Sequence, residues 1–225
     1  MIRSLEDVTR FARGRGPKKL AVLAPEDGEF MVSVKQARDA GYIEPVLIGD
    51  PELMRRVADE SDFDMDGIEV IAERDRQAVA DRGTAMLFAG DVDMAGKGQI
   101  PTAFIYRAII REEVRAGSGR TISVVSLWEL PEHKRFMAFA DTGVNIRPNL
   151  AAKEEILKNA LFFFHILGYD CPRVVILSGK RPIGHVPLSF TDGEILRAKA
   201  REGSFGDCDV LPASSFAEIF TSAGE

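Results

Sequence analysis

The sequence predicts an α/β protein with three α/β/α layers and a mostly parallel sheet. In the first half of the chain, short apolar runs alternate with segments of helical periodicity, a pattern typical of parallel strands with helices on both faces of the sheet. After residue 118, two apolar runs follow each other closely, which adds an antiparallel element. The chain has 225 residues, of which 45% are hydrophobic and 28% charged, so disordered and fibrous classes are excluded.

The first strand is predicted at residues 18–25, an apolar run that begins after Gly16-Pro17. A helix over 29–40 follows, because apolar residues recur there at helical spacing and Gly41 stands where a C-terminal cap belongs. The same alternation predicts the other elements of this half: strands at 44–50 and 68–73, helices at 51–57 and 74–88, and a short strand within 91–98 that leads into a helix over 101–114.

Gly117-Ser118-Gly119 marks the predicted boundary between a first subdomain, 1–117, and a second, 118–225. The second subdomain is predicted to contain the following elements: strands at 121–130 and 135–142 joined by a hairpin connection at 131–134, a helix over 150–167, and a buried strand at 172–179. Residues 191–200 and the tail from Asp209 are predicted to be helical.

The charge balance and the apolar runs limit the partners of the protein. Lysine and arginine number 29 against 35 aspartates and glutamates, and this net charge of −6 argues against nucleic acid or an anionic membrane and favours a small molecule or a protein as the partner. Charges occur throughout the N-terminus, and no apolar run approaches the ~20 residues that span a bilayer. We therefore expect a cytoplasmic protein without a membrane segment.

The cysteines and histidines do not predict a metal site. Cys171 and Cys208 are too few for a disulfide framework and belong to no C-x-x-C pattern. His133, His165 and His185 are spread over different predicted elements and share no ligand spacing with each other or with the cysteines. We expect reduced thiols and no bound metal.

Gly96-Lys97-Gly98 is similar to the end of a phosphate-binding P-loop, but the match fails twice. Five residues instead of four separate Gly90 from Gly96, and Gly98 stands at the position of the Mg²⁺-binding Ser or Thr, so the pattern argues against an NTPase. Lys97 still follows a strand and precedes a helix N-terminus, where free N–H groups, the helix dipole and an ammonium group can hold an anion. The alternative is an ordinary solvated lysine in a loop.

The densest polar cluster follows the predicted strand at 135–142. Its members are Asp141, Thr142, Asn145, Arg147 and Asn149. The carboxyl ends of strands are where open α/β sheets bind ligands, which makes this cluster a candidate site. Alternatively, these residues build the turn and cap the helix that follows.

Four stretches of the chain have distinctive sequences: GDVDMAGKGQIPTAFIYRAI at 90–109, GRTISVVSLWELP at 119–131, DTGVNIRPNLAAKEEILKNA at 141–160 and PRVVILS at 172–178. The third is similar to the signature T-D-x-x-V-N-I-x-P-x-L-x-x-K-x-x-I-x-x-N-A of the phosphate acetyl/butyryltransferase family, with Asp141-Thr142 inverting its opening pair. The first resembles the M-K-G segment of that family. The chain therefore resembles the family over most of its length, the butyryl branch more than the acetyl branch.

The resemblance implies reversible transfer of an acyl group between coenzyme A and inorganic phosphate, with coenzyme A as a substrate and with no cofactor or metal. It also implies a homodimer whose two α/β/α subdomains enclose the active site in a cleft, as in isocitrate and isopropylmalate dehydrogenases. The site residues that it implies are Lys97, Gly98, Thr102, Arg120, Ser123, Asp141, Thr142 and Asn145. Such a reaction needs donors for phosphate and for an oxyanion, and a base that converts the CoA thiol into a thiolate.

The sequence also departs from the pattern of the family. Val124 stands where butyryl-type members have the histidine of a Ser-His pair, and Gly179-Lys180-Arg181 replaces a segment that contains glutamate. In the corresponding stretch, 209–216, no aspartate stands at the position of the family's candidate base, and the chain ends at Glu225, before a further strand, a loop and a terminal helix of the family. Three hypotheses follow: a phosphate acyltransferase with full, reduced or lost activity, a non-catalytic acyl-CoA- or phosphate-binding accessory subunit, or an interaction module unrelated to the family.

Phe162, Phe163 and Phe164 are consecutive on one predicted helix, so they must face more than one direction. At least one of them is expected to contact a partner chain in the homodimer. Phe163 is the residue whose truncation would test this contact.

Overall fold

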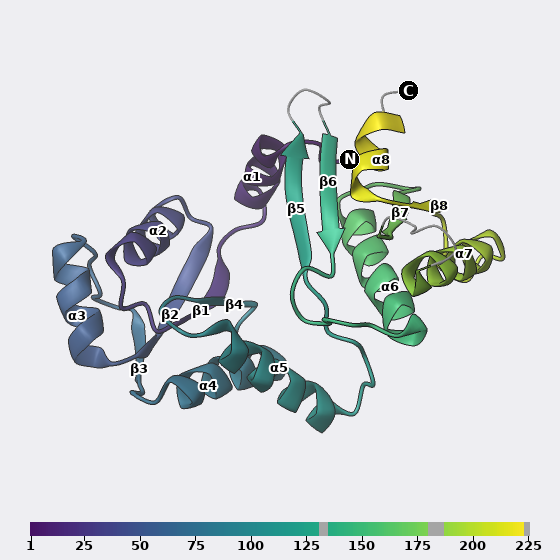
Figure 1. Cartoon of the computed structure of the whole chain (residues 1–225). Helices are drawn as coiled ribbons and strands as arrows, with labels where there is room; N and C mark the ends of the chain where they lie inside the picture. Colours follow the sequence, from purple (N-terminus) through teal and green to yellow (C-terminus); the bar gives the residue numbers. More distant parts are fainter. Residues whose placement is uncertain (131–134, 180–186, 223–225) are drawn as a thin grey trace. The chain divides into compact units, whose positions relative to one another are not determined.

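The computed structural model describes residues 1–130, 135–179 and 187–222, with side chains to residue 219 (Figure 1). The predicted hairpin connection at 131–134 and residues 180–186, which include Lys180, Arg181 and His185, lie outside the described residues. The chain forms two compact units, one of Leu5–Arg120 and one of Thr121–Glu225 together with Met1–Ser4.

The unit Leu5–Arg120 alternates helices and parallel strands, as the sequence predicts. Its elements are α1 (Leu5–Arg13), β1 (Lys18–Leu23), α2 (Gly28–Asp39), β2 (Ile43–Gly49), α3 (Pro51–Glu60), β3 (Glu69–Ala72), α4 (Arg76–Ala89), β4 (Met94–Lys97) and α5 (Thr102–Ala116). The strands form one four-stranded sheet in the order β3-β2-β1-β4, and every pair in it is parallel.

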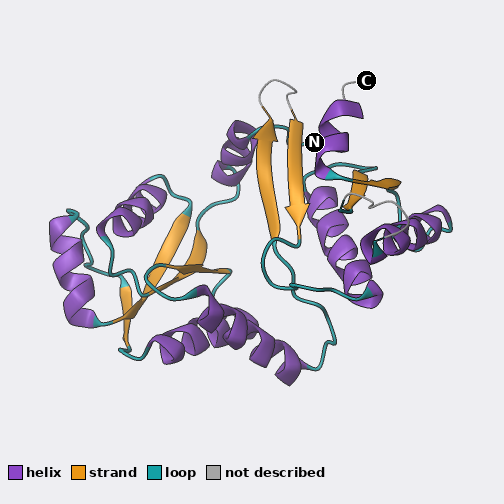
Figure 2. Ribbon diagram, viewed as in Figure 1, coloured by secondary structure: helices purple, strands orange, loops and turns teal. Residues whose placement is uncertain are grey.

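Helices cover both faces of this sheet, which gives the predicted three layers (Figure 2). Val22 of β1 and Leu47 of β2 pack with residues of α2 and α3 in one core. The neighbouring residues in the strands, Leu23 and Ile48, face the other way and pack with residues of α4 and α5 in a second core. This alternation follows from the two-residue period of a strand, and near-continuous apolar runs are typical of a parallel sheet buried on both faces.

Capping residues set the start of three helices. Asp27, Asp50 and Asp75 are the N-caps of α2, α3 and α4, and each side chain accepts a hydrogen bond from a backbone N–H of the first turn. Pro51 follows its cap at the first helical position, where a missing N–H costs nothing. Gly90 ends α4 in the left-handed conformation, with φ 79°. Local sequence therefore fixes these boundaries.

The second unit combines an antiparallel pair of strands with a parallel pair. Its elements are β5 (Val125–Leu130), β6 (Arg135–Ala140), α6 (Leu150–Ile166), β7 (Arg173–Leu177), α7 (Leu188–Arg201), β8 (Asp209–Ser214) and α8 (Phe216–Ser222). β5 and β6 are antiparallel, which confirms the predicted antiparallel element, and β7 and β8 are parallel. The fold class predicted from the sequence, a mostly parallel α/β protein with an antiparallel pair, is confirmed.

Two predictions for this unit are wrong. The tail from Asp209 was expected to be helical, but 209–214 form β8, which pairs with β7. The sequence does not predict this strand, because the run is short and contains Pro212. The strand forms through its pairing with β7. The strand expected at 121–130 begins only at Val125, because side chains from other segments bind the backbone of 121–124.

α6 and α7 pack against the β7–β8 pair through a third core, which includes Leu161 and Leu196. Position 193 has no room for a side chain, because a Cβ at Gly193 would lie 2.7 Å from the Cβ of Ala213. Lys153 of α6 also forms an ion pair with the buried Asp192 of α7, with Nζ and Oδ2 2.6 Å apart. Among the described helices, none combines the length and the hydropathy needed to span a bilayer.

Candidate functional site

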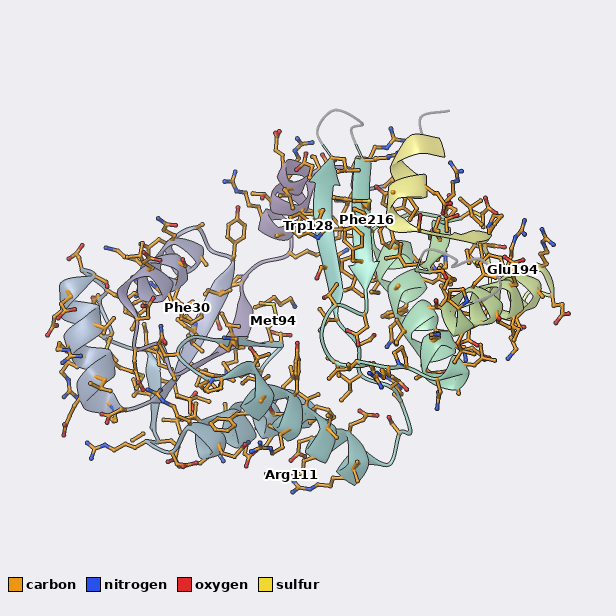
Figure 3. The ribbon with its side chains drawn as sticks, viewed as in Figure 1. Phe30, Met94, Arg111, Trp128, Glu194 and Phe216 are labelled. Atoms are coloured by element: carbon orange, nitrogen blue, oxygen red, sulfur yellow. The ribbon has the colours of Figure 1, made fainter. Side chains whose placement is uncertain are left out.

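The topology of the first unit marks one place for a ligand. In the strand order β3-β2-β1-β4, β2 and β3 lie on one side of β1 and β4 lies on the other. The direction in which successive strands of the chain are placed in the sheet therefore reverses between β1 and β4. In open α/β sheets, ligands bind outside the carboxyl ends of the strands at such a switch point. β4 begins at Met94, labelled in Figure 3, and ends at Lys97, so the predicted site residues Lys97 and Gly98 lie at this position.

Lys97 is exposed, and its ammonium group is only partly used by the protein. Its Nζ donates to the backbone carbonyl of Ile100 at 3.2 Å, which orients the side chain toward the start of α5. No carboxylate among the described residues lies within ion-pair distance of Lys97. The remaining N–H donors and the positive charge can therefore bind an anion.

Gly98 serves the packing of the loop. Its backbone N–H donates to the carbonyl of Leu23 at 2.8 Å, so this N–H is not available to a ligand. A Cβ at position 98 would lie 2.4 Å from the carbonyl oxygen of Ala24 and 2.9 Å from Cδ1 of Phe30, which Figure 3 labels on α2. Glycine thus allows the loop after β4 to pass close to the end of β1.

Thr102 begins the last helix of this unit, and Arg120 lies in the segment that follows that helix. Thr102 is the first residue of α5, is exposed, and follows Pro101, which provides no side-chain cap. The first N–H groups of α5 therefore point out of the helix beside the Lys97 loop. Arg120 is the last residue of the unit and is also exposed.

One charged residue at the same edge of the sheet was not predicted from the sequence. Glu26 follows β1, and its side chain is only 5% exposed. Its carboxylate accepts from the backbone N–H of Asp50 at 3.0 Å and forms an ion pair with Arg76 at 2.5 Å. Glu26 connects the loops after β1 and β2 to the start of α4, and its charge is already balanced within the protein.

The other predicted site residues lie in the second unit, where the β5–β6 pair begins and ends. Asp141 directly follows β6 and organises the loop after it. Its Oδ1 accepts from the backbone N–H groups of Val124, Gly143 and Val144 at 3.1–3.2 Å, and its Oδ2 accepts from the backbone N–H of Asn145 at 2.7 Å. These donors bring the start of β5 and the end of β6 together.

The contacts of Asp141 also set its protonation. Partial burial raises the pKa of this carboxyl, but hydrogen bonds from the Asn145 side chain and from the backbone N–H groups of Gly143, Asn145 and Val144 lower the pKa to about 2. A general base works best with a pKa near the operating pH. Asp141 is therefore a poor proton acceptor, and its role is to fix the loop.

Ser123 and Asn145 are close to this carboxylate. The Asn145 side-chain amide donates to Asp141 Oδ2 at 2.7 Å and to the carbonyl of Ile122 at 2.8 Å. Ser123 Oγ accepts from the side-chain amide of Asn159 at 2.9 Å. Sequence reasoning did not assign a role to Asn159, although its place in the Asn-Ala pair that ends the matched stretch at 141–160 was a signal.

The remaining residues of the cluster have separate roles. Thr142 Oγ1 shares a hydrogen bond of 2.9 Å with Ser126 Oγ. Asn149 is the N-cap of α6 and accepts from the N–H of Ala152 at 2.9 Å, as the capping alternative predicted. Arg147 is exposed on the same loop.

The structure therefore groups the predicted residues by unit. Lys97, Gly98 and Thr102 lie together at the carboxyl end of β4, with Arg120 in the segment that follows α5. Ser123, Asp141, Thr142 and Asn145 form the second group, at one end of the β5–β6 pair. The first group offers the Lys97 ammonium group as a donor to an anionic ligand, and the second offers the Ser123 hydroxyl.

Metal-ligating and thiol groups are not part of either group. Across residues 1–130, 135–179 and 187–222, no cluster of histidine, cysteine and acidic residues could hold a metal ion. Partial burial raises the pKa of Cys208, and the nearby Cys171, Asp209 and Asp207 raise the pKa further. Cys208 is therefore a thiol at neutral pH and not a thiolate nucleophile.

Comparisons with known proteins match this chain to one family. The family model described as phosphate acetyl/butaryl transferase matches residues 76–181, which include all eight predicted site residues. The phosphate butyryltransferase of Clostridium acetobutylicum is 25% identical over 210 residues, which cover 93% of this chain and 70% of that protein. The phosphate butyryltransferase of Clostridium beijerinckii is 24% identical over 191 residues, which cover 85% of this chain and 63% of that protein.

A solved structure shows the same fold. The branched-chain phosphotransacylase from Enterococcus faecalis V583 superposes with a TM-score of 0.68 at 18% identity, over 92% of this chain and 74% of that one. The chain is thus similar to the phosphate acetyl/butyryltransferase family. It spans about two thirds of the length of the two butyryltransferases.

Proposed function

We propose that the protein transfers an acyl group between acyl-CoA and inorganic phosphate. The observation that supports this most directly is Lys97, an exposed ammonium group without a carboxylate partner at the topological switch point of a parallel sheet. The names of the relatives, phosphate butyryltransferase and phosphate acetyltransferase, fit acyl transfer and do not fit the accessory-subunit alternative.

The chemistry requires stabilisation of negative charge at two points. A phosphate oxygen forms a bond with the thioester carbonyl carbon, the C–S bond breaks, and CoA leaves as a thiolate with the electron pair. Lys97 is proposed to bind the phosphate, with the uncapped N–H groups at Thr102 as further donors. In the second unit, the Ser123 hydroxyl is proposed as a donor to an anionic oxygen of the ligand, whereas both side-chain hydrogens of Asn145 are already donated to Asp141 and to the Ile122 carbonyl.

The reverse direction needs a base, because the CoA thiol must become a thiolate before it attacks the acyl phosphate. Asp141 does not suit this role, since its oxygens accept several hydrogen bonds and its pKa is about 2. At 209–216, where the family's candidate aspartate was sought, Ser214 ends β8 and Phe216 begins α8. We therefore expect acyl phosphate formation from acyl-CoA to be the easier direction to detect.

The proposal includes a cytoplasmic homodimer that needs no cofactor and binds no nucleic acid. Phe162 and Ile166 support the dimer, because they lie one turn apart on α6 and are 68% and 62% exposed. Phe163 is half-buried, less exposed than Phe162, and it makes an edge contact with Phe164. Phe162 therefore replaces Phe163 as the residue proposed to contact the partner.

The test is phosphate-dependent release of CoA from a panel of short acyl-CoAs, detected with a thiol reagent. The wild-type protein should release CoA in proportion to phosphate, and Lys97→Ala should lose most of this activity. Lys18→Ala is the matched control, because Lys18 is an exposed lysine at the opposite end of the sheet. If the folded wild-type protein releases no CoA from any acyl-CoA, the result would contradict acyl transfer and favour the accessory-subunit hypothesis.

A further inference from the structure

Asn159 of α6 contacts the segment that precedes β5 at two points. Its side-chain Nδ2 donates to the backbone carbonyl of Thr121 at 2.9 Å and to Ser123 Oγ at 2.9 Å. A carbonyl oxygen can only accept, so the contact with Thr121 identifies the atom that faces the segment as the nitrogen of the amide. Both hydrogens of this NH₂ group are therefore used, and the second one points at the Ser123 oxygen.

The residues on either side of Ser123 are fixed in the same way. The carbonyl of Ile122 accepts from the Asn145 amide at 2.8 Å, and the N–H of Val124 donates to Asp141 Oδ1 at 3.2 Å. Residues 121–124 belong to no helix or strand, so these side chains replace the ladder contacts that a strand would have. The backbone at Ser123 thus has one defined position.

The direction of the Ser123 hydroxyl follows from these contacts. A hydroxyl has one hydrogen to donate and lone pairs that accept. The Asn159 amide donates to the oxygen, so the hydroxyl hydrogen must point elsewhere, and it has no acceptor in the described part of the protein. Ser123 is half-buried, so this hydrogen is available to a ligand.

We propose that Asn159 is a positioning residue that makes the Ser123 hydroxyl a hydrogen-bond donor to an oxygen of bound phosphate. The inference rests on the proposed function for the identity of the ligand, and it adds the residue that sets the direction of the donor. Asn159→Asp reverses the contact, because a carboxylate accepts the Ser123 hydrogen and removes it from the ligand. Asn159→Asp also loses the contact with the Thr121 carbonyl.

The experiment is a calorimetric titration of the full chain with inorganic phosphate, which does not depend on turnover. Asn159→Asp and Ser123→Ala should each weaken phosphate binding about tenfold or more, the effect of losing a hydrogen bond to a charged group. The double variant should bind no more weakly than Ser123→Ala alone, because both changes remove the same donor. Asn149→Asp is the matched control: it makes the same substitution at an exposed N-cap, where Asp and Asn are equally suitable.

A purely structural role for Asn159 predicts a different result. In that case Asn159→Asp would weaken phosphate and acyl-CoA binding alike, and its effect would multiply with that of Ser123→Ala. Either this pattern or an unchanged phosphate affinity in Asn159→Asp overturns the inference, as does a wild-type protein that binds no phosphate. Failure of CoA release in the presence of normal phosphate binding rejects only the proposed reaction.

Discussion

Asn145 donates two hydrogen bonds to a single oxygen of Asp141, since its backbone nitrogen and its side-chain nitrogen each lie 2.7 Å from Asp141 Oδ2. The other oxygen accepts from the backbone N–H of Val124, which precedes β5, and from those of Gly143 and Val144, which follow β6. A single carboxylate therefore determines the shape of the loop that contains the candidate site residues of the second unit.

The stability of this loop should depend on pH. Partial burial raises the pKa of Asp141, but hydrogen bonds from the Asn145 side chain and from the N–H groups of Gly143, Asn145 and Val144 lower the pKa to about 2, against 3.8 for an ordinary aspartate. The folded-state pKa is depressed, so the stabilisation is fully present above the ordinary pKa and is lost as pH falls from about 4 toward 2.

Asp141→Asn tests this dependence. The variant should lose about 2–3 kcal/mol of unfolding free energy at neutral pH, because an amide replaces a charged acceptor and its NH₂ group faces N–H donors. Chemical denaturation from about pH 6 to pH 3 should show that the difference between wild type and variant shrinks as the pH falls. Profiles that stay parallel would show that the Asp141 charge does not stabilise the fold.

Gly98→Ala should destabilise the first unit. The added Cβ would lie 2.4 Å from the carbonyl oxygen of Ala24, a backbone atom that cannot move without disturbing β1. We expect a loss of about 1–3 kcal/mol in denaturant unfolding, the usual cost of overpacking. Gly96→Ala, in β4 just before this loop, is the control, because its Cβ would meet Leu20 at an ordinary 3.5 Å. Equal losses in the two variants would contradict the steric explanation.

Lys97→Ala should affect binding without affecting stability. Removing the ammonium group should weaken phosphate affinity by about 1.5–3 kcal/mol, the contribution of a hydrogen bond to a charged group. The unfolding free energy should change by less than about 0.5 kcal/mol, because the side chain is exposed and has a single backbone contact. An unchanged phosphate affinity in calorimetry would remove Lys97 from the site.

Phe162→Ser should dissociate the proposed homodimer. Phe162 is 68% exposed on α6. Replacing it with serine removes apolar surface that the dimer would bury and that the monomer exposes to water. Sedimentation velocity should show a shift from dimer to monomer in this variant. Phe88→Ser is the control, because Phe88 is an exposed phenylalanine of α4, in the other unit. A wild-type protein that sediments as a monomer would reject the dimer itself.

Local sequence signals predicted most of the fold. The N-caps Asp27 and Asp50 and the left-handed Gly90 set helix ends through contacts within a few residues, which a sequence displays directly. β8 was missed because its definition is not local. The run 209–214 contains Pro212 and alternates weakly, and its strand conformation depends on pairing with β7 and packing under α7.

As with the fold, only the part of the candidate site that depends on local sequence order could be predicted. Lys97 was found from its place between a strand and a helix, since that order alone puts it at an edge of the sheet. Asn159 was missed because its contacts with Thr121 and Ser123 span 38 and 36 residues, and no spacing rule connects a helix to the segment before a hairpin. The hydrogen bonds that occupy the Asp141 carboxylate could not be predicted from the sequence either. Most of their donors are backbone N–H groups, which do not depend on the residue type.

The fixed segment at 121–124 constrains how this protein can evolve. Asp141, Asn145 and Asn159 bind successive groups of one short stretch of backbone, so a substitution at any of them removes support that the other two cannot replace. We expect the three positions to covary among homologues. A lineage that abandons one of them should also show a different sequence across the whole stretch, while the exposed residues around it vary freely.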